Sequence, residues 1–337
     1  MEEGGIGPDT YAYVVIRDGE RVVAILPTCT YRAMRLDQIA GDTPEWLLAP
    51  IRTLFPALLR LHVTFCGNLI GEGRLLAEPG AESAAAAAVS AVMSHARQEG
   101  TRCVIFKDFA DTGLDDLRPA LREHGFFDVA GLPDAIITLT CSSFEEYLAG
   151  LPAKPRRNAR HKIRKFAAHP NLRLAVTTDF GHLTDQMLPL YQHVLDRADH
   201  RLDVWTARLL ADLAAAPDTV TVTCHDGDRL AGFLLCMITD AELVALRVGL
   251  DYAAAPNAFV YHNLHYRAIE LAISRGCASV NLTQTHYTPK LEMGARLVSR
   301  THAVAHLNPL ARAILRRFLP SALRDPSIPA EPEKGRS

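Results

Sequence analysis

The sequence predicts an α/β (α+β) protein of two similar units, each a mixed central sheet flanked by helices. Asp-Gly pairs, typical of tight hairpin turns, stand between β-rich runs at Asp18-Gly19 and at Asp226-Gly227. Helical patterns over 82–99 and 259–275 each end at a glycine and are followed by an apolar strand. The chain has 337 residues, which is long for a single core. We interpret the repeat as an internal duplication; two independently acquired domains of similar order are the alternative.

We expect residues 1–10 to be a loose tail and residues 11–140 to form the first domain. Its expected elements are a hairpin over 11–31, a strand at 61–70, the helix at 82–99, a buried strand at 102–109, a helix at 114–124 and a last strand at 134–140.

The second domain is expected over 141–325, before a disordered tail at 326–337 that is rich in proline and glutamate. Ser143 has the type and position of a helix N-cap. A basic segment, a strand at 172–178, helices within 182–216 and a three-strand meander over 219–250 follow. The domain then continues with the helix at 259–275, a short strand at 278–282, a closing strand at 296–306 and a basic helix that ends at Pro320.

Bulk composition excludes several classes of protein. The formal net charge is −2, so overall charge argues neither for nor against a nucleic-acid partner. The seven cysteines form no CxxC pair and stand mostly in apolar runs, which is typical of a reduced cytoplasmic protein without structural zinc. No apolar run approaches the ~20 residues of a membrane span, and the acidic, glycine-rich N-terminus does not resemble a signal peptide.

Three segments carry a resemblance to a known family. They are FEEYLAGLPAKPRRNARHKIRKF, YHNLHYRAIELAISRGCASVNL and THYTPKLEMGA, in which a lysine precedes a glycine before the closing strand. Together they resemble the double-GNAT, Fem-like acyltransferases, which include peptidoglycan aminoacyltransferases and the acetyltransferase-like domain of polysaccharide and natural-product clusters. The likeness covers residues 140–305 well and the first domain only through its order of elements. It implies two tandem GNAT-like domains, the first degenerate and the second catalytic.

A polar loop follows the buried strand at 278–282, a position where α/β proteins often hold ligands. We predict catalytic roles for Thr283, His286, Tyr287 and Lys290, and substrate binding for Gln284. Histidine is the usual general base near neutral pH, lysine can hold a phosphate or carboxylate, and threonine and glutamine can bond a carbonyl. The alternative is a solvated loop. The first copy has KDFADTG at the equivalent place and lacks such a set.

A basic run without acidic residues follows Pro152, with seven positive charges in the twelve residues of 154–165. Such a helix can hold a polyanion such as tRNA, a CoA tail or a phosphorylated sugar, with salt-sensitive affinity. The alternative is a solvated basic face. The residues predicted to bind donor phosphate or tRNA are Arg156, Arg157, Arg160, Arg164 and Lys165.

Other predicted substrate-binding residues flank the second helix. Arg247 interrupts the apolar strand VALRVGL, so its side chain must reach solvent, a cleft or a partner. Tyr261 and His262 stand at the start of the helix and can face a donor or a substrate; packing against the sheet is the alternative. No third ligand completes a metal site with His262 and His265, so no metal is predicted.

These observations predict a transferase that moves an acyl or aminoacyl group from an activated donor to an amine of a small molecule, by direct attack in a cleft between the domains. No permanently bound cofactor is expected; acyl-CoA or aminoacyl-tRNA is the co-substrate. The turn APNAFVYH before the second helix has no glycine to approach a pyrophosphate closely, which makes tRNA a donor candidate beside CoA. The alternative function is a non-catalytic ligand- or RNA-binding protein on the same fold. The oligomeric state is not predicted.

Overall fold

The computed structural model describes residues 7–35, 60–68, 70–197, 204–239, 241–254 and 257–323, and its described strands form two mixed sheets. Pro133–Val298 forms one compact unit, called here the central unit; the described residues of Gly7–Leu132 and those from Ser299 onward form the other, the terminal unit. The expected tail at 326–337 and the first six residues of the expected tail at 1–10 lie outside the described residues.

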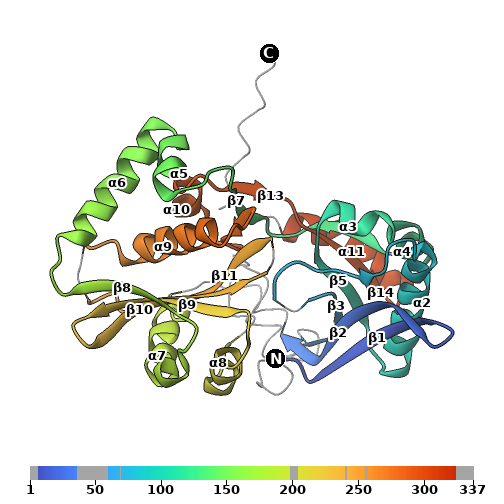
Figure 1. Ribbon diagram of the computed structural model, residues 1–337. Helices are drawn as coiled ribbons and strands as arrows, with labels where there is room; N and C mark the ends of the chain where they lie inside the picture. The colour runs from blue at the N-terminus through green and yellow to red at the C-terminus, as the bar shows by residue number, and fades with distance from the viewer. Residues whose placement is uncertain are drawn as a thin grey trace, which may run out of the picture. The chain divides into compact units, whose positions relative to one another are not determined.

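The terminal unit holds a sheet in the order β1-β2-β3-β5-β14-β6, with β4 paired to β2 (Figure 1). Only β3 and β5 are parallel; the other neighbours are antiparallel. Its strands are β1 (Thr10–Asp18), β2 (Arg21–Arg35), β3 (Arg60–Cys66), β4 (Leu76–Ala77), β5 (Cys103–Phe109), β6 (Phe127–Ala130) and β14 (Thr301–His306). Its described helices are α2 (Glu82–Gln98), α3 (Asp111–Asp115), α4 (Arg118–Glu123) and α11 (Pro309–Ala322).

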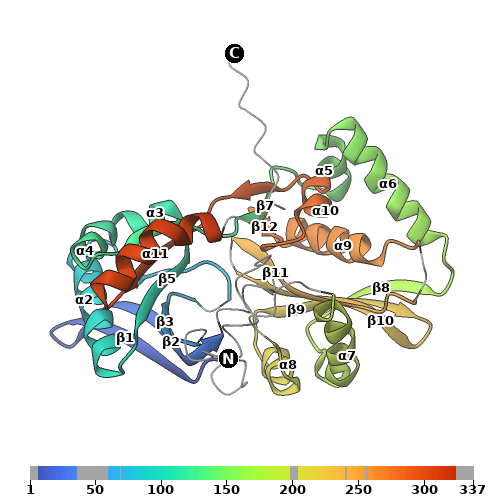
Figure 2. The same cartoon turned by 180° about the vertical axis from the view of Figure 1, so that it is seen from behind.

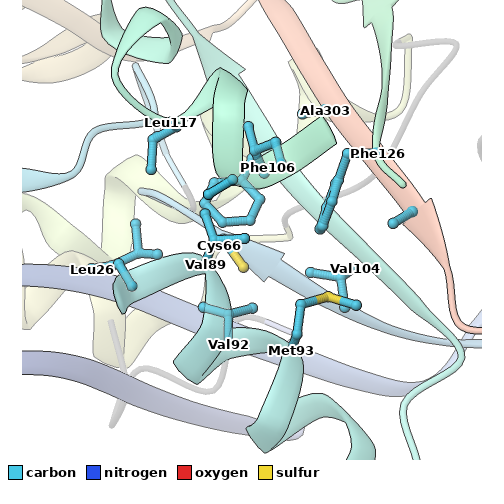
Figure 3. Close-up of a cluster of buried hydrophobic side chains, with 14 of the residues drawn as sticks. Leu26, Cys66, Val89, Val92, Met93, Val104, Phe106, Leu117, Phe126 and Ala303 are labelled. Atoms are coloured by element: carbon cyan, nitrogen blue, oxygen red, sulfur yellow. The ribbon is translucent and has the colours of Figure 1, made fainter. Parts of the chain in front are cut away.

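Side chains alternate between the two faces of this sheet, as the strand period of two requires. On β5, Val104 and Phe106 join the core beneath α2, which Figure 3 shows around Phe106, Val89 and Met93. Cys103 and Ile105 join a second cluster with α11 on the other face. The terminal unit is therefore a sheet between α2 and α11 (Figures 1 and 2).

The central unit holds the second sheet, in the order β13-β7-β12-β11-β10-β9-β8. Helix α9 lies on one face of the meander, and α7 and α8 lie on the other (Figure 1). The strands are β7 (Asp134–Thr138), β8 (Leu172–Thr177), β9 (Thr219–Asp226), β10 (Arg229–Ile238), β11 (Glu242–Leu250), β12 (Ser279–Asn281) and β13 (Arg296–Val298). The helices are α5 (Phe144–Gly150), α6 (Ala153–Ala167), the 3-10 turn η3 (Gly181–Leu183), α7 (Thr184–Leu195), α8 (Ala207–Ala214), α9 (Val260–Ser274) and α10 (Tyr287–Glu292).

The two sheets repeat one topology, as the predicted duplication requires. The order β1-β2-β3-β5-β14-β6 matches β9-β10-β11-β12-β7-β13 strand for strand, and in both only the third and fourth strands are parallel. A helix joins those two parallel strands in each copy, α2 in one and α9 in the other. Strand β8 is an addition to the central sheet.

The structure corrects the expected domain boundaries of 11–140 and 141–325. Strand β7, expected to close the first domain, pairs with β12 and β13 in the central sheet. The expected closing strand at 296–306 is two strands, and its second half, β14, pairs with β5 and β6 in the terminal sheet. Each copy thus supplies the fifth strand of the other copy's sheet.

Several local expectations are confirmed and some are corrected. The Ser143 hydroxyl accepts a hydrogen bond from the Glu146 amide at 3.2 Å, as an N-cap does. The helix expected at 114–124 is instead the pair α3 and α4, and α11 continues through Pro320 to Ala322. The polar segment after β12 is not wholly a loop, because α10 begins at Tyr287. All seven cysteines are free thiols. No helix of the described residues is long and apolar enough to cross a membrane.

Candidate functional site

Strands β11 and β12 of the central unit are paired at one end and diverge at the other. Their parallel pairing ends at Val244 and Asn281. Beyond this point β11 stays paired with β10 as far as Leu250. The chain after β12 stays with β7 instead, because the Leu282 amide donates to Ala135 O and the Ala135 amide donates to Thr283 O. The described residues offer no strand to pair β11 on its β12 side past Val244, and an edge of this kind can pair with the extended part of a ligand.

A β-bulge interrupts the regular pairing of β11 with β10 where β11 and β12 begin to diverge. Leu235 of β10 pairs with Arg247 and Cys236 pairs with Ala245, which leaves Leu246 as the extra residue. The half-buried Arg247 guanidinium lies 4.9 Å from the Trp205 ring and donates to Leu246 O at 2.7 Å. Burial lowers the pKa of Arg247, and Tyr191 opposes this shift. The predicted substrate-binding arginine therefore lies on the bulge beside the diverging strands.

The turn before α9 has the backbone shape that usually calls for glycine. Asn257 and Phe259 have φ values of 70° and 56°, in the left-handed region. The buried Asn263 side chain donates from Nδ2 to Phe259 O at 3.0 Å, Ala258 O at 3.4 Å and Lys162 O at 3.4 Å. A close-approach turn can therefore form without glycine, because a side-chain amide holds it.

The start of α9 leaves backbone donors open. Residue Phe259, the N-cap, supplies no side-chain hydrogen bond. No acceptor among the described residues takes the amide protons of Val260, Tyr261 or His262. Such amides, together with the positive end of the helix dipole, favour a bound anion.

The basic helix α6 packs beside this turn. The His161 ring lies 6.0 Å from the Phe259 ring, and Lys162 O accepts from Asn263. A hollow on α6 is lined by Ala153, Arg156, Arg157, Arg160 and Arg164.

The predicted phosphate-binding residues on α6 differ in their hydrogen-bond and ion-pair partners. Arg156 donates to Ala149 O at 2.7 Å, which ties it to the end of α5. Arg160 pairs with Glu145 at 3.5 Å between exposed side chains, a contact of small energy. Arg157, Arg164 and Lys165 are exposed and have no ion pair among the described residues, so they keep their positive charge available.

The segment after β12 is held in an unusual backbone conformation. Thr283, Thr285 and His286 have φ values of 62°, 63° and 51°. Left-handed conformations of such residues cost energy and gather at functional sites. The exposed His286 is the N-cap residue of α10, and the Thr283 amide donates to Asn281 Oδ1 at 2.7 Å. The predicted base is thus presented to solvent at the end of a strained turn.

Lys290 is a buried amine inside this turn. Its Nζ donates to Gln284 O at 2.7 Å and to Thr283 O at 3.2 Å, and only 5% of the residue is exposed. Burial lowers the pKa of Lys290 to about 7; the charge of Asp134 opposes this shift and that of Arg247 adds to it. The buried Asn281 links this group to Asp134, since its Nδ2 donates to Asp134 Oδ2 at 3.3 Å.

Tyr261 lies at the centre of a group of imidazole rings. Its ring centroid is 4.2 Å from that of His265, 5.5 Å from that of His262 and 6.0 Å from that of His286. Burial is the largest cause that lowers the pKa of His262 to about 4 and that of His265 to about 3, so both rings are neutral at pH 7. His265 Nδ1 therefore donates to Tyr261 O at 2.7 Å, and the buried Nδ1 of His262 has no hydrogen-bond partner among the described residues.

The structure brings most of the predicted residues of the second half into one neighbourhood of the central unit. Tyr261 and His262 of α9 approach His286 of the loop, and Lys290 holds the same loop from beneath. Tyr287 is buried, and its hydroxyl donates to Pro133 O at 3.0 Å. This hydrogen bond connects α10 to the residue just before β7. Sequence reasoning did not single out three buried polar residues that shape this site: Asp134, Asn263 and Asn281.

The equivalent place in the terminal unit is filled by the chain itself. Gly73 forms a parallel bridge with Phe109, and its amide donates to Asp108 O at 3.0 Å. A Cβ at Gly73 would overlap Lys107 O, and one at Gly67 would lie 2.9 Å from the Phe109 ring. In this unit, therefore, described residues occupy the place beyond the last parallel pair of β3 and β5, whereas β11 has no described partner strand past Val244.

No group of three or more His, Cys, Asp or Glu side chains in the described ranges is arranged to hold a metal ion.

A mixed sheet with two diverging parallel strands joined by a helix, present in two copies, is a tandem GNAT-like fold. Residues 153–290, all within the central unit, match the family model described as Acetyltransferase (GNAT) domain. The predicted fold class and the resemblance to double-GNAT, Fem-like proteins are confirmed.

Among solved structures, FemX is similar, with 10% identity, a TM-score of 0.62 and coverage of 92% of this chain and 91% of that one. L-PGS from Bacillus licheniformis has 10% identity, a TM-score of 0.58 and coverage of 91% and 88%. The C-terminal domain of a putative lysylphosphatidylglycerol synthetase from Agrobacterium fabrum has 12% identity, a TM-score of 0.57 and coverage of 90% and 88%. At these identities the likeness concerns the fold. No curated protein matches the sequence. The family model supports an acyltransferase in general terms.

Proposed function

We propose that the chain transfers an acyl or aminoacyl group from an activated ester or thioester to an amine of a small molecule, and that the central unit is the catalytic one. The observation that carries this is the divergence of β11 and β12, with the α9 turn and the strained loop of Thr283–His286 at the ends of the two strands. An amide bond forms between the acyl carbon and the amine nitrogen, the bond to the leaving oxygen or sulfur breaks, and the leaving group takes up a proton.

The donor binds along β11 in this proposal. The backbone groups of β11 that point away from β10 pair with the extended part of the donor, as an added strand would. Its phosphates meet the free amides at the start of α9 and the arginines Arg157 and Arg164 of the neighbouring α6. Acyl-CoA and aminoacyl-tRNA share this chemistry, an acyl ester beside phosphate, and both remain candidates.

His286 is the proposed base. The attacking amine must lose a proton as its nitrogen bonds to the acyl carbon, and an exposed imidazole beside Tyr261 can accept it. Lys290 is a positioning residue, because its amine bonds the carbonyls of Thr283 and Gln284 and so fixes the turn that presents His286. Arg247, on the bulge beside the diverging strands, binds an anionic group of the substrate.

A donor competition tests the proposal. The chain is incubated with a pool of small-molecule amines and either acyl-CoA esters or charged tRNA, and amide products are measured by mass spectrometry. Product from thioesters that survives RNase assigns CoA; product only from charged tRNA that falls steeply with salt assigns tRNA. We expect one of these results, and the absence of product from both classes contradicts the proposal.

Matched variants place the donor. Arg157→Ala with Arg164→Ala should weaken donor binding, whereas Arg275→Ala, an exposed arginine at the far end of α9, should not. Equal effects of both changes contradict the proposed phosphate position.

The alternative function, a non-catalytic ligand- or RNA-binding protein, drew its support from the missing glycines before α9. The left-handed Asn257 and Phe259 weaken that support, because the turn takes the glycine-like shape without them. Thermal shift separates the two functions: stabilisation by an acyl donor that is also turned over favours the transferase, and stabilisation without turnover favours the alternative.

A further inference from the structure

Helix α11 of the terminal unit exposes a row of large apolar side chains. Leu310, Ile314 and Phe318 are 72%, 53% and 62% exposed. Their spacing of four residues places them along one side of the helix. No other described helix of either unit exposes three large hydrophobic residues. Contiguous exposed apolar rows of this kind mark interaction sites.

The row is not needed for the core of the terminal unit. The opposite side of α11 carries Leu315, Leu319 and Leu323, which pack against the cluster that includes Val304. Arg312 adds a hydrogen bond from Nη1 to His124 O at 3.3 Å. The helix thus lies flat along its sheet, as Figure 2 shows, with the row of Leu310, Ile314 and Phe318 turned to solvent.

Positive charge accompanies the exposed row. The 14 residues of α11 include three arginines and no aspartate or glutamate. Arg317 is exposed and its guanidinium lies 5.8 Å from the Phe318 ring, whereas the exposed Arg316 stands four residues after Arg312, on the side of the helix away from the row. Apolar side chains flanked by arginines on a helix held parallel to a surface are typical of helices that lie in the headgroup layer of an anionic bilayer.

We propose that α11 docks the protein on the surface of an anionic lipid bilayer, with Leu310, Ile314 and Phe318 entering the headgroup region and Arg317 meeting lipid phosphates. A second copy of the chain fits this face less well. Pairing two α11 helices through this row would bring the two Arg317 side chains together with no acidic residue on either helix to offset them. The proposal is independent of the proposed transferase activity.

Vesicle co-sedimentation of the full chain tests the proposal. We expect binding to vesicles of 30% phosphatidylglycerol in phosphatidylcholine, weakening with salt, and little binding to phosphatidylcholine alone. Arg317→Gln should lower the partition coefficient about fivefold, whereas Arg316→Gln, on the other side of the helix, should change it little. Ile314→Gln with Phe318→Gln should abolish binding at the same lipid concentration.

The control variants are Leu76→Gln and Arg97→Gln, which change exposed residues of the same unit away from α11. They should leave binding unchanged, and circular-dichroism melting should show all variants folded, since every changed side chain is exposed. Equal binding to neutral vesicles, or no binding to anionic ones, overturns the proposal. So does a dimer in light scattering that the Ile314 and Phe318 changes abolish, because the row then serves a second copy.

Discussion

The buried amine of Lys290 should make the stability of the central unit depend on pH above neutrality. Its folded pKa is about 7, against 10.5 for an ordinary lysine. Between these values the unfolded chain binds a proton that the folded chain does not. Stability therefore rises as the pH is raised from about 7 towards 10.5, and the penalty for burying the amine is fully present below about 7.

The size of this effect follows from the shift. Linkage with these two pKa values predicts that raising the pH from 7 to 9 adds about 2 kcal/mol to the unfolding free energy of the wild type. Lys290→Met keeps the length of the side chain and removes the titration. The unfolding free energy of the wild type minus that of Lys290→Met should therefore rise by about 2 kcal/mol over that interval.

Urea unfolding in a Trp46→Phe background measures this difference, because the buried Trp205 then reports on the central unit alone. Lys165→Met, at an exposed lysine of α6, is the control and should show no growing difference from the wild type. If the difference for Lys290→Met is the same at pH 7 and pH 9, the amine titrates near its ordinary value and the reasoning from burial is refuted.

Three further predictions concern the same framework. Because the folded pKa of His265 is about 3, lowering the pH from 6.5 to 4.5 should cost the wild type about 2 kcal/mol that His265→Gln does not lose, measured by urea unfolding; equal losses would contradict it. Asn263→Ala removes the amide that bonds three carbonyl oxygens and should destabilise the central unit by about 1–3 kcal/mol. It should also weaken donor binding in titration calorimetry; an unchanged affinity would show that the donor does not bind at this turn. Gly73→Ala should destabilise the terminal unit by more than about 2 kcal/mol in thermal melts, since its Cβ overlaps Lys107 O. Gly113→Ala, whose Cβ would meet only the Phe109 ring at 3.8 Å, should cost less.

The repeated architecture could be predicted because its signals are local. An Asp-Gly turn, a helix ended by glycine and an apolar strand each depend on neighbouring residues, and they occur twice in the same order. The exchange of β7 and β14 could not be predicted in this way. Both are short apolar strands that suit an interior position of either sheet, and their pairing depends on tertiary contacts.

The candidate site was predicted only in part for the same reason. The residues of 283–290 are adjacent in sequence and could be named together. Asp134, the buried carboxylate near these residues, could not be predicted with them. It lies 147 residues before its partner Asn281, and the two meet only because strand β7 is exchanged. The prediction from the missing glycines also needs correction, since it considered the turn alone and not Asn263, which holds the turn from within α9.

The same backbone feature has opposite surroundings in the two copies. In each copy a left-handed residue stands two positions after the last parallel pair: Asp108 follows Phe106, and Thr283 follows Asn281. In the terminal unit the Gly73 amide bonds Asp108 O and fills the space between the parallel strands. In the central unit the carbonyl of Thr283 accepts from Lys290 instead, and β11 keeps its free edge. Because a donor needs that edge, the chemistry we propose belongs to the central unit, and Gly73 gives a physical reason why the first copy does not share it.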